Sequence, residues 1–332
     1  MMSVMDVTFR LLEPDEGTLL SGAIEAAYGQ SYDVRWVYDP IEVGARIAAG
    51  AYVACIAESP AGELLCHIGM SLAAAGDAVG HSGQAVTLPA ARGQHLFTRT
   101  KRYLMDWARE RGLAGMYSEA TAAHPYSQKA NIELGAHETG FLLGWIPASV
   151  SNDAAGERRG RQSAALLYLK LNDGHERKVY APARHREIVT QTIELCELRG
   201  TISDPPAATT LPERTELHVE VDRDHNLALL TVLEPGVDLE EAVGAERHHL
   251  FHRANLDAVY IDLPLERPAT ALLAEHLERL GLSYAGVFPN HRTDGDVLRM
   301  QSLHRVRVKA DDIAVASDHG RELLEYVLAD LG

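Results

Sequence analysis

The stretch LAGMYSEATAAHP (residues 113–125) decides the fold, because a related stretch, LDAVYIDLPLERP, follows at residues 256–268. Each stretch predicts an apolar strand, then a proline that opens a helix. After that helix, LGAHETGFLLGWIP (residues 134–147) resembles LGLSYAGVFP (residues 280–289). The shared order of strand, proline, helix, Leu-Gly, strand, glycine and proline predicts an internal duplication.

The length of the chain agrees with a duplication. It has 332 residues, which is too long for one ordinary domain and suits two domains of about 150 residues each. We place the first domain at residues 1–175 and the second at residues 176–332. Apolar residues make up 46% of the chain, so each half has enough of them to bury a core of its own.

Charge and cysteine content exclude several classes of protein. The formal net charge of −16 repels phosphate backbones at long range, which disfavours DNA as a partner. The three cysteines form no CxxC pair, so we expect a reduced cytoplasmic compartment and no metal site. The N-terminus lacks the pattern of a signal peptide, and no apolar run approaches the ~20 residues that span a membrane.

Strand and helix patterns alternate along both halves. The first half predicts strands at 7–12, 51–58, 63–72, 84–88, 113–120, 140–146 and 164–171, with helices near 13, over 92–112 and over 125–134. The second half predicts helices at 183–199, 238–254, 269–280 and 321–331, and strands at 217–221, 226–233, 258–263 and in two later segments. The predicted class is therefore α/β, with mixed sheets flanked by helices.

The segment QAVTLPAARGQHLFTRTKRYLMDWARERG (residues 84–112) carries a family resemblance. It is similar to the middle region of the GNAT superfamily of N-acyltransferases, where a strand leads through an Arg/Gln-x-x-Gly-x-Gly/Ala turn into a helix. In that family the backbone N–H groups of the turn hold the pyrophosphate of acyl-CoA, as a helix N-terminus does for anions in general. The similarity is clear over residues 84–147 and predicts two tandem GNAT-type domains, each with a mixed, mostly antiparallel sheet.

The resemblance places a donor loop at residues 86–97 and implies acyl-CoA, such as acetyl-CoA, as the donor. Arg92 matches the first position of the turn, whereas His95 and Phe97 stand where the family has small residues. A Cβ at these positions narrows the space for a pyrophosphate, so the loop binds either acyl-CoA in an altered geometry or a different donor. The residues expected to bind the donor are Val86, Leu88, Arg92, Gly93, Gln94, His95, Leu96 and Asn131.

Asn131 also marks a departure from the family. Many members carry a tyrosine at this position of the following helix, as general acid for the leaving thiolate. In the second half, DLEEAVGAERHHLFHRANL (residues 238–256) replaces the donor turn and puts acidic residues where a phosphate would lie. The second domain is therefore interpreted as a degenerate copy.

Three residues are candidates for acid–base chemistry. Glu119, near the end of its strand, is a candidate base, with a solvent-facing side chain as the alternative. His124 is a second candidate base or a residue that makes a local hydrogen bond at the start of a helix. Tyr126 is a candidate acid or a tyrosine packed on its helix.

The predicted activity is transfer of an acyl group from acyl-CoA to a small-molecule amine by direct attack, as in small-molecule biosynthesis. An aminoacyl-tRNA-dependent acyltransferase is an alternative, because residues 89–112 carry six Lys or Arg residues against two acidic ones. A non-catalytic binding or regulatory module is the third hypothesis, motivated by His95 and Asn131.

Overall fold

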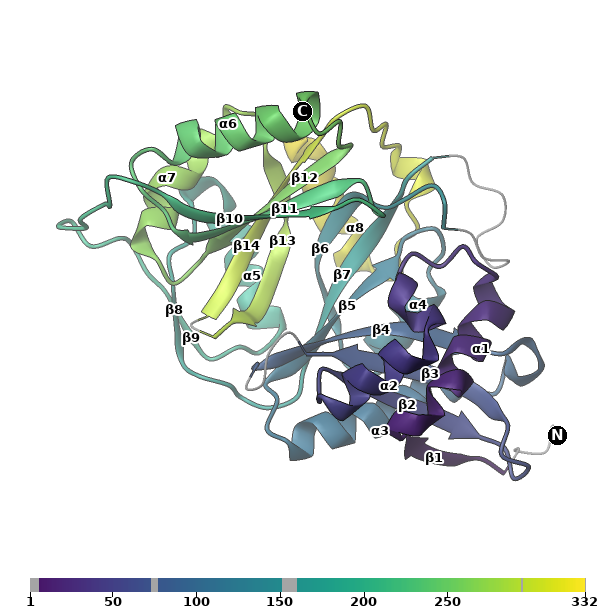
Figure 1. The fold of residues 1–332 in the computed structure, drawn as a ribbon. Coiled ribbons are helices and arrows are strands. Elements are labelled where there is room, and N and C mark those ends of the chain that lie inside the picture. The colour runs from purple at the N-terminus through teal and green to yellow at the C-terminus, as the bar shows by residue number, and fades with distance from the viewer. Residues whose placement is uncertain (1–5, 73–76, 151–159, 294, 332) are drawn as a thin grey trace.

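The fold was determined as a computed structural model, which describes residues 6–72, 77–150, 160–293 and 295–331 (Figure 1). The strands are β1 Thr8–Leu11, β2 Tyr52–Glu58, β3 Leu64–Ser71, β4 Val79–Thr87, β5 Gly115–Thr121, β6 His137–Ile146, β7 Gln162–Lys170, β8 Arg177–Val179, β9 Gly200–Ile202, β10 Glu216–Asp222, β11 Leu227–Glu234, β12 Ala258–Pro264, β13 Ser283–Arg292 and β14 Gly295–Leu303. The α-helices are α1 Gly17–Tyr28, α2 Pro40–Ala48, α3 Leu96–Glu110, α4 Tyr126–Glu133, α5 Arg186–Leu195, α6 Leu239–His252, α7 Pro268–Glu278 and α8 Asp318–Asp330. Short 3-10 turns are η1 Pro14–Glu16, η2 Arg35–Tyr38, η3 Pro89–Ala91, η4 Ala183–His185 and η5 Ala310–Asp312.

One sheet runs through both halves of the molecule. Its 12 strands have the order β1-β2-β3-β4-β5-β7-β6-β13-β14-β12-β11-β10. The pairs β4–β5 and β11–β12 are parallel, and the other neighbours are antiparallel. The order 3-4-5-7-6 in the first half therefore returns, mirrored across the sheet, as 10-11-12-14-13 in the second. This mixed, mostly antiparallel sheet with flanking helices confirms the predicted fold class.

The two halves meet where β6 lies beside β13, in the middle of Figure 1. Gly140 is paired with Gly286 at this junction. A Cβ on Gly140 would lie 2.3 Å from the carbonyl oxygen of Ala285, and one on Gly286 would lie 2.7 Å from the Cα of Gly140. Two facing glycines thus let the strands approach closely, and they occupy matching positions in the duplicated stretches. The sequence did not predict that the two sheets join.

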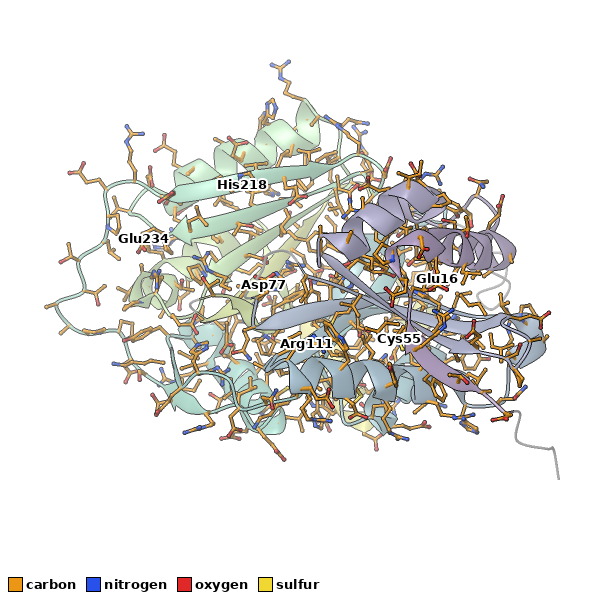
Figure 2. The ribbon with its side chains drawn as sticks, turned by 60° about the horizontal axis from the view of Figure 1, so that its bottom comes forward. Glu16, Cys55, Asp77, Arg111, His218 and Glu234 are labelled. Carbon is orange, nitrogen blue, oxygen red and sulfur yellow. The ribbon has the colours of Figure 1, made fainter. Side chains whose placement is uncertain are left out.

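Helices cover the two faces of the sheet unevenly. α1 and α2 pack on one face of β2 and β3, over a core that includes Tyr52 and Ile56. α3 packs on the opposite face, where the Cys55 thiol of β2 lies 3.6 Å from the carbonyl oxygen of Thr100 (Figure 2). The helix α8 returns from the C-terminus to pack on β6 and β13, so its segment covers strands of both halves.

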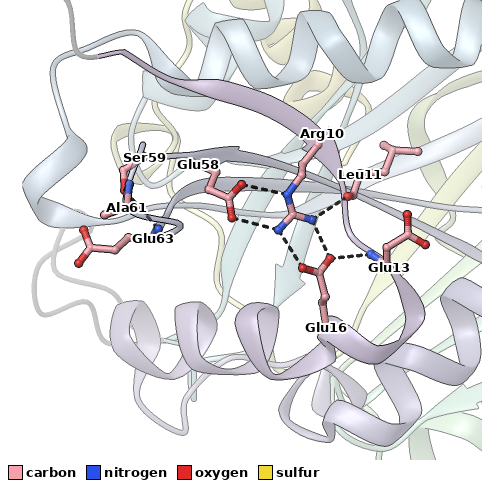
Figure 3. Close-up of polar contacts among 8 residues, drawn as sticks. All are labelled: Arg10, Leu11, Glu13, Glu16, Glu58, Ser59, Ala61 and Glu63. Carbon is pink, nitrogen blue, oxygen red and sulfur yellow. Dashed lines mark hydrogen bonds and ion pairs between the residues drawn. The ribbon is translucent and has the colours of Figure 1, made fainter.

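The N-terminal strand is fixed by one arginine. Arg10 of β1 bonds both carboxylate oxygens of Glu58 on β2, each at 3.0 Å (Figure 3). The same guanidinium bonds Glu16 of η1 at 2.6 and 2.8 Å and the carbonyl of Leu11 at 3.1 Å. Two carboxylates on one planar cation hold β1 to the sheet edge and set the direction in which the chain enters α1.

The predicted elements agree with the structure at most positions, with three main differences. β4 begins at Val79, earlier than the predicted start at residue 84, and α2 was not predicted. β8 and β9 form a small parallel sheet of their own, which was not predicted. Among the described residues, no helix has the length and apolar composition needed to cross a membrane. The predicted domain boundary at residues 175 and 176 falls between β7 and β8.

Candidate active site

β4 and β5 diverge and leave an open fork in the sheet. They are paired only from Val79 to His81 on β4 and from Gly115 to Tyr117 on β5. β4 then continues to Thr87 and β5 to Thr121 with no pairing between them in the described residues. The outer edge of β5 is paired with β7 along its length, and β4 is paired with β3. Backbone groups on the inner edges of the fork are therefore open to a ligand.

A β-bulge turns β4 away from β5. Gln84 has a φ of +48°, and the pairing of β4 with β3 shifts register around it. The buried His67 of β3 holds this bulge, because its Nδ1–H donates to the carbonyl oxygen of Gln84 at 2.8 Å. Burial lowers the pKa of His67 to about 4, which keeps the imidazole neutral in this role. The bulge re-aims the strand at the mouth of the fork.

The predicted donor turn leads from β4 into α3. Gly93 has a φ of +78°, and His95, the residue before α3, has a φ of +54°. In the part of the chain that the structure describes, the backbone N–H groups of residues 93–98 donate to no protein acceptor. No acidic residue lies in the first turn of α3. The turn therefore presents unpaired donors and the positive end of the helix dipole, the combination that binds anions.

The expected donor residues take different positions around this turn. Arg92 and His95 are exposed, and Gln94 is half-buried. Leu96 and Val86 are buried in the cores on either face of the sheet. Leu88 differs from expectation, because its N–H donates to the carbonyl oxygen of Leu65 at 3.0 Å and is not free to bind a donor.

Asn131 is buried on α4 and touches a residue that the sequence did not single out. Its Oδ1 accepts a hydrogen bond from Nζ of Lys101, which also donates to Ser118 Oγ at 2.9 Å. Lys101 was expected to be part of the basic surface of α3, and the structure instead buries it. The sequence feature that could have predicted this burial is the spacing of Lys101. It lies four residues after Phe97 and four before Met105, on the apolar face of the helix.

Glu119 lies just beyond the closed end of the fork, on the face that bears α1 and α2. Its carboxylate is 3.5 Å from Nε2 of His81, and its side chain is 14% exposed. The His81 ring stacks on Tyr117 with centroids 4.9 Å apart. His81 was not predicted as a site residue, because only the parallel pairing of β4 and β5 brings it to Glu119.

His124 and Tyr126 lie together beyond the end of β5. Their rings are 4.9 Å apart between centroids, and Tyr126 is 67% exposed at the start of α4. The carboxylate of Glu119 lies beside His81, whereas His124 and Tyr126 contact each other.

A cavity of about 360 Å³ opens beside the closed end of the fork and is shared by the two halves. His81, Tyr117 and Asp77 of the first half line it (Asp77 is labelled in Figure 2). His291 and Arg292 of β13 line its other side. The ring of His291 packs edge-on against Tyr117 with centroids 5.3 Å apart, and burial lowers the pKa of His291 to about 4. A larger cavity of about 630 Å³ lies between the end of α3 and α5, on the other face.

Solved structures similar to this chain include several N-acetyltransferases. They include the ribosomal-protein-S18-alanine N-acetyltransferase from Escherichia coli, with 15% identity, a TM-score of 0.40, and coverage of 51% of this chain and 97% of that one. A GNAT superfamily phosphinothricin acetyltransferase from Sinorhizobium meliloti in complex with AcCoA has 17% identity and a TM-score of 0.42, covering 51% and 91%. A spermidine N-acetyltransferase SpeG chimera from Vibrio cholerae and hSSAT has 16% identity and a TM-score of 0.41, covering 50% and 95%.

Each of these structures is matched over about half of this chain, so the chain is similar to GNAT acetyltransferases over a length close to one of its halves. No protein-family model matches the sequence, and no curated protein sequence matches it.

Proposed function

We propose that the chain is an acyl-CoA-dependent N-acyltransferase that acts on a small-molecule amine by direct attack on the thioester. The observation that carries this proposal is the open fork between β4 and β5, which lies directly before the unpaired N–H groups of α3. A donor with an anionic end and an amide-bearing arm suits both features, because the anion takes the helix N-terminus and the amides take the open strand edges. Acyl-CoA has this chemistry.

The acceptor approaches from the face that carries Glu119. In the proposed reaction the Glu119–His81 pair takes a proton from the amine, whose nitrogen then bonds to the thioester carbon. The adjoining cavity holds the rest of the acceptor, and its volume suits a small molecule.

Ligand binding tests the donor assignment first. Acetyl-CoA at a hundredfold excess over its Kd is expected to stabilise the folded protein by about 2.7 kcal/mol, which a thermal-shift assay detects. The absence of a shift with acetyl-CoA, propionyl-CoA and CoA would contradict the proposal and favour a non-catalytic module.

A variant tests the base. Glu119→Gln is expected to keep the acetyl-CoA shift and to reduce acetyl transfer to a panel of small amines by about 10²–10⁴-fold, followed as release of the CoA thiol. Glu133→Gln, an exposed change on the neighbouring α4, is the matched control and leaves the rate unchanged. Equal rates for wild type and Glu119→Gln would exclude Glu119 as the base.

The exposed arginines on and next to α3 support an aminoacyl-tRNA donor as a second candidate. Arg92, Arg102, Arg109 and Arg111 are exposed, although Arg109 is paired with Asp106 at 2.9 Å. Retention of charged tRNA at low salt, lost at high salt, together with no thermal shift with acetyl-CoA, would favour this donor over CoA.

A further inference from the structure

Lys101 is a buried cation with neutral partners. Its side chain lies on α3 with only 1% exposure, and Nζ donates to Ser118 Oγ and Asn131 Oδ1. In the described residues no carboxylate lies within ion-pair distance of it. An ammonium group loses its hydration on burial, and two neutral oxygens compensate only in part. Burial accordingly lowers the pKa of Lys101 to about 7.

The position of Lys101 is defined by its bond to β5. Ser118 directly follows Tyr117, the last residue of β5 that is paired with β4. Successive strand residues point to opposite faces, so Ser118 faces α3 and Glu119 faces α1 and α2. Lys101 and Glu119 therefore flank the closed end of the fork from opposite sides of the sheet.

We propose that Lys101 is the catalytic residue that protonates the leaving sulfur in the acyl transfer, an inference that rests on the proposed function. The amine nitrogen bonds to the carbonyl carbon from the Glu119 side, and the Glu119–His81 pair accepts the proton that the nitrogen releases. The carbon–sulfur bond then breaks with its electron pair on sulfur. The Lys101 ammonium transfers one proton to that sulfur, which leaves a CoA thiol, an amide and a neutral lysine that solvent reprotonates.

The surroundings of Lys101 suit this step. Asn131 is held by its own bond, in which Nδ2 donates to the carbonyl of Ser127 at 2.7 Å, so its Oδ1 stays directed at Nζ. A thiolate that forms beside the ammonium supplies the negative charge that the protein does not, and the attraction is strong because the site is buried. A proton donor works best when its pKa lies near the working pH, which is the condition of Lys101.

The experiment compares CoA with desulfo-CoA, in which hydrogen replaces the thiol. Wild type is expected to bind CoA at least about tenfold more tightly than desulfo-CoA, because the thiol lies beside Lys101, and its rate of acyl transfer is expected to fall at high pH. Lys101→Met is expected to lose both the preference for CoA and the fall in rate at high pH. Lys101→Gln keeps a donor for Asn131 without the charge and is expected to lose both as well. Lys129→Met, an exposed change on α4, is the control that loses neither.

The outcomes separate the two proposals. Wild type that binds neither ligand would overturn the donor site, and the role of Lys101 with it. Wild type that binds both equally, or Lys101→Met and Lys101→Gln that keep the preference for CoA, would overturn the role of Lys101 alone and leave the donor site in place. The rate of acyl transfer is expected to fall at high pH in wild type, where Lys101 is neutral, and a variant with the same high-pH fall would also contradict the proposal.

Discussion

The strand pair β4–β5 in the first half and the pair β11–β12 in the second have the same topology. They differ in how far along the strands the pairing extends. Both pairs are parallel and precede the antiparallel strands that reach the junction. The pairing of β4 with β5 ends at Tyr117, whereas that of β11 with β12 continues through Asp262, two residues beyond the matching Tyr260. The first pair leaves a fork, and the second pair closes it with backbone hydrogen bonds.

The helices that follow β4 and β11, which are α3 and α6, also differ at their N-termini. α3 starts without an acidic residue in its first turn. α6 follows Asp238 and has Glu240 and Glu241 in its first turn. Carboxylates at a helix N-terminus occupy the position of an anionic ligand and interact with the same dipole. The positive end of the α3 dipole thus has no acidic side chain in its first turn, whereas that of α6 is compensated by two.

A carboxylate sits at the matching position of each half. Glu119 of β5 faces Leu166 on β7 and has His81 at 3.5 Å. Asp262 of β12 faces Arg299 on β14, and this buried pair forms two bonds, at 2.6 and 2.7 Å. The two halves therefore differ in what stands beside this carboxylate: the first half has an open space between its strands, whereas the second half has a buried ion pair and contributes β13 to the shared cavity.

The largest expected effect on stability comes from removing Arg299, the cation of the buried ion pair in the second half. Arg299→Met leaves the Asp262 carboxylate buried without its partner, so we expect a loss of roughly 3–5 kcal/mol in the free energy of unfolding, measured with urea. The double variant Asp262→Leu with Arg299→Met is expected to recover most of that loss. Glu119→Gln, at the matching open position, is expected to cost about 1 kcal/mol or less. Equal losses for Arg299→Met and Glu119→Gln would show that the two carboxylates are held alike.

The junction between the halves is the next target. Gly140→Ala places a Cβ against the carbonyl oxygen of Ala285, and β6 and β13 must separate to accept it. We expect a loss of about 3 kcal/mol or more in the free energy of unfolding, and a similar loss for Gly286→Ala. Gly22→Ala on α1 is the control, because nothing lies near its Cβ and alanine favours a helix by about 0.5–1 kcal/mol. A tolerated Gly140→Ala would mean that the halves do not need this close approach.

The sequence predicted the parts of the fold that local pattern determines. The strand at 113–120 and the helix at 125–134 correspond to β5 and α4, because apolar periodicity and proline mark them. Burial of Lys101 was not predicted, since it depends on Ser118 and Asn131, which only tertiary packing brings to α3. The roles of Glu119, His124 and Tyr126 stay predictions.

Neither the fork between β4 and β5 nor the junction of β6 with β13 could be predicted from the sequence, and the reason is the same for both. The point where β4 leaves β5 depends on a bulge that His67 fixes from another strand. The pairing of β6 with β13 joins segments that are separated by most of the second half. Both features arise from contacts between elements, and the residue pattern within a single element does not determine such contacts.

A smaller effect is expected when the acidic first turn of α6 is introduced into α3. Thr98→Glu gives α3 an acidic first turn like that of α6, so the dipole interaction is expected to leave stability unchanged or raise it by about 0.3–1 kcal/mol. Affinity for acetyl-CoA is expected to fall about tenfold, which corresponds to about 1.4 kcal/mol. Thr98→Gln is the neutral control and keeps the affinity. Isothermal titration of the two variants checks this, and equal affinities would place the anion of the donor away from α3.

The smallest expected effect concerns a pH-dependent contact between the halves. His225, in the turn between β10 and β11, lies 2.8 Å from Asp33 of the first half and 2.7 Å from Asp222. Burial alone would lower the pKa of His225, but the hydrogen bond to Asp33 and the nearby carboxylates outweigh it and raise this pKa above its usual 6.5. The contact is therefore fully present below about pH 6.5 and is lost as the pH rises through the raised value. We expect wild type to exceed His225→Gln in Tm at pH 6 by an amount that corresponds to about 1 kcal/mol or less, and the difference to vanish by pH 9. A difference that is the same at both values would mean that His225 joins the halves through its shape and not through its charge.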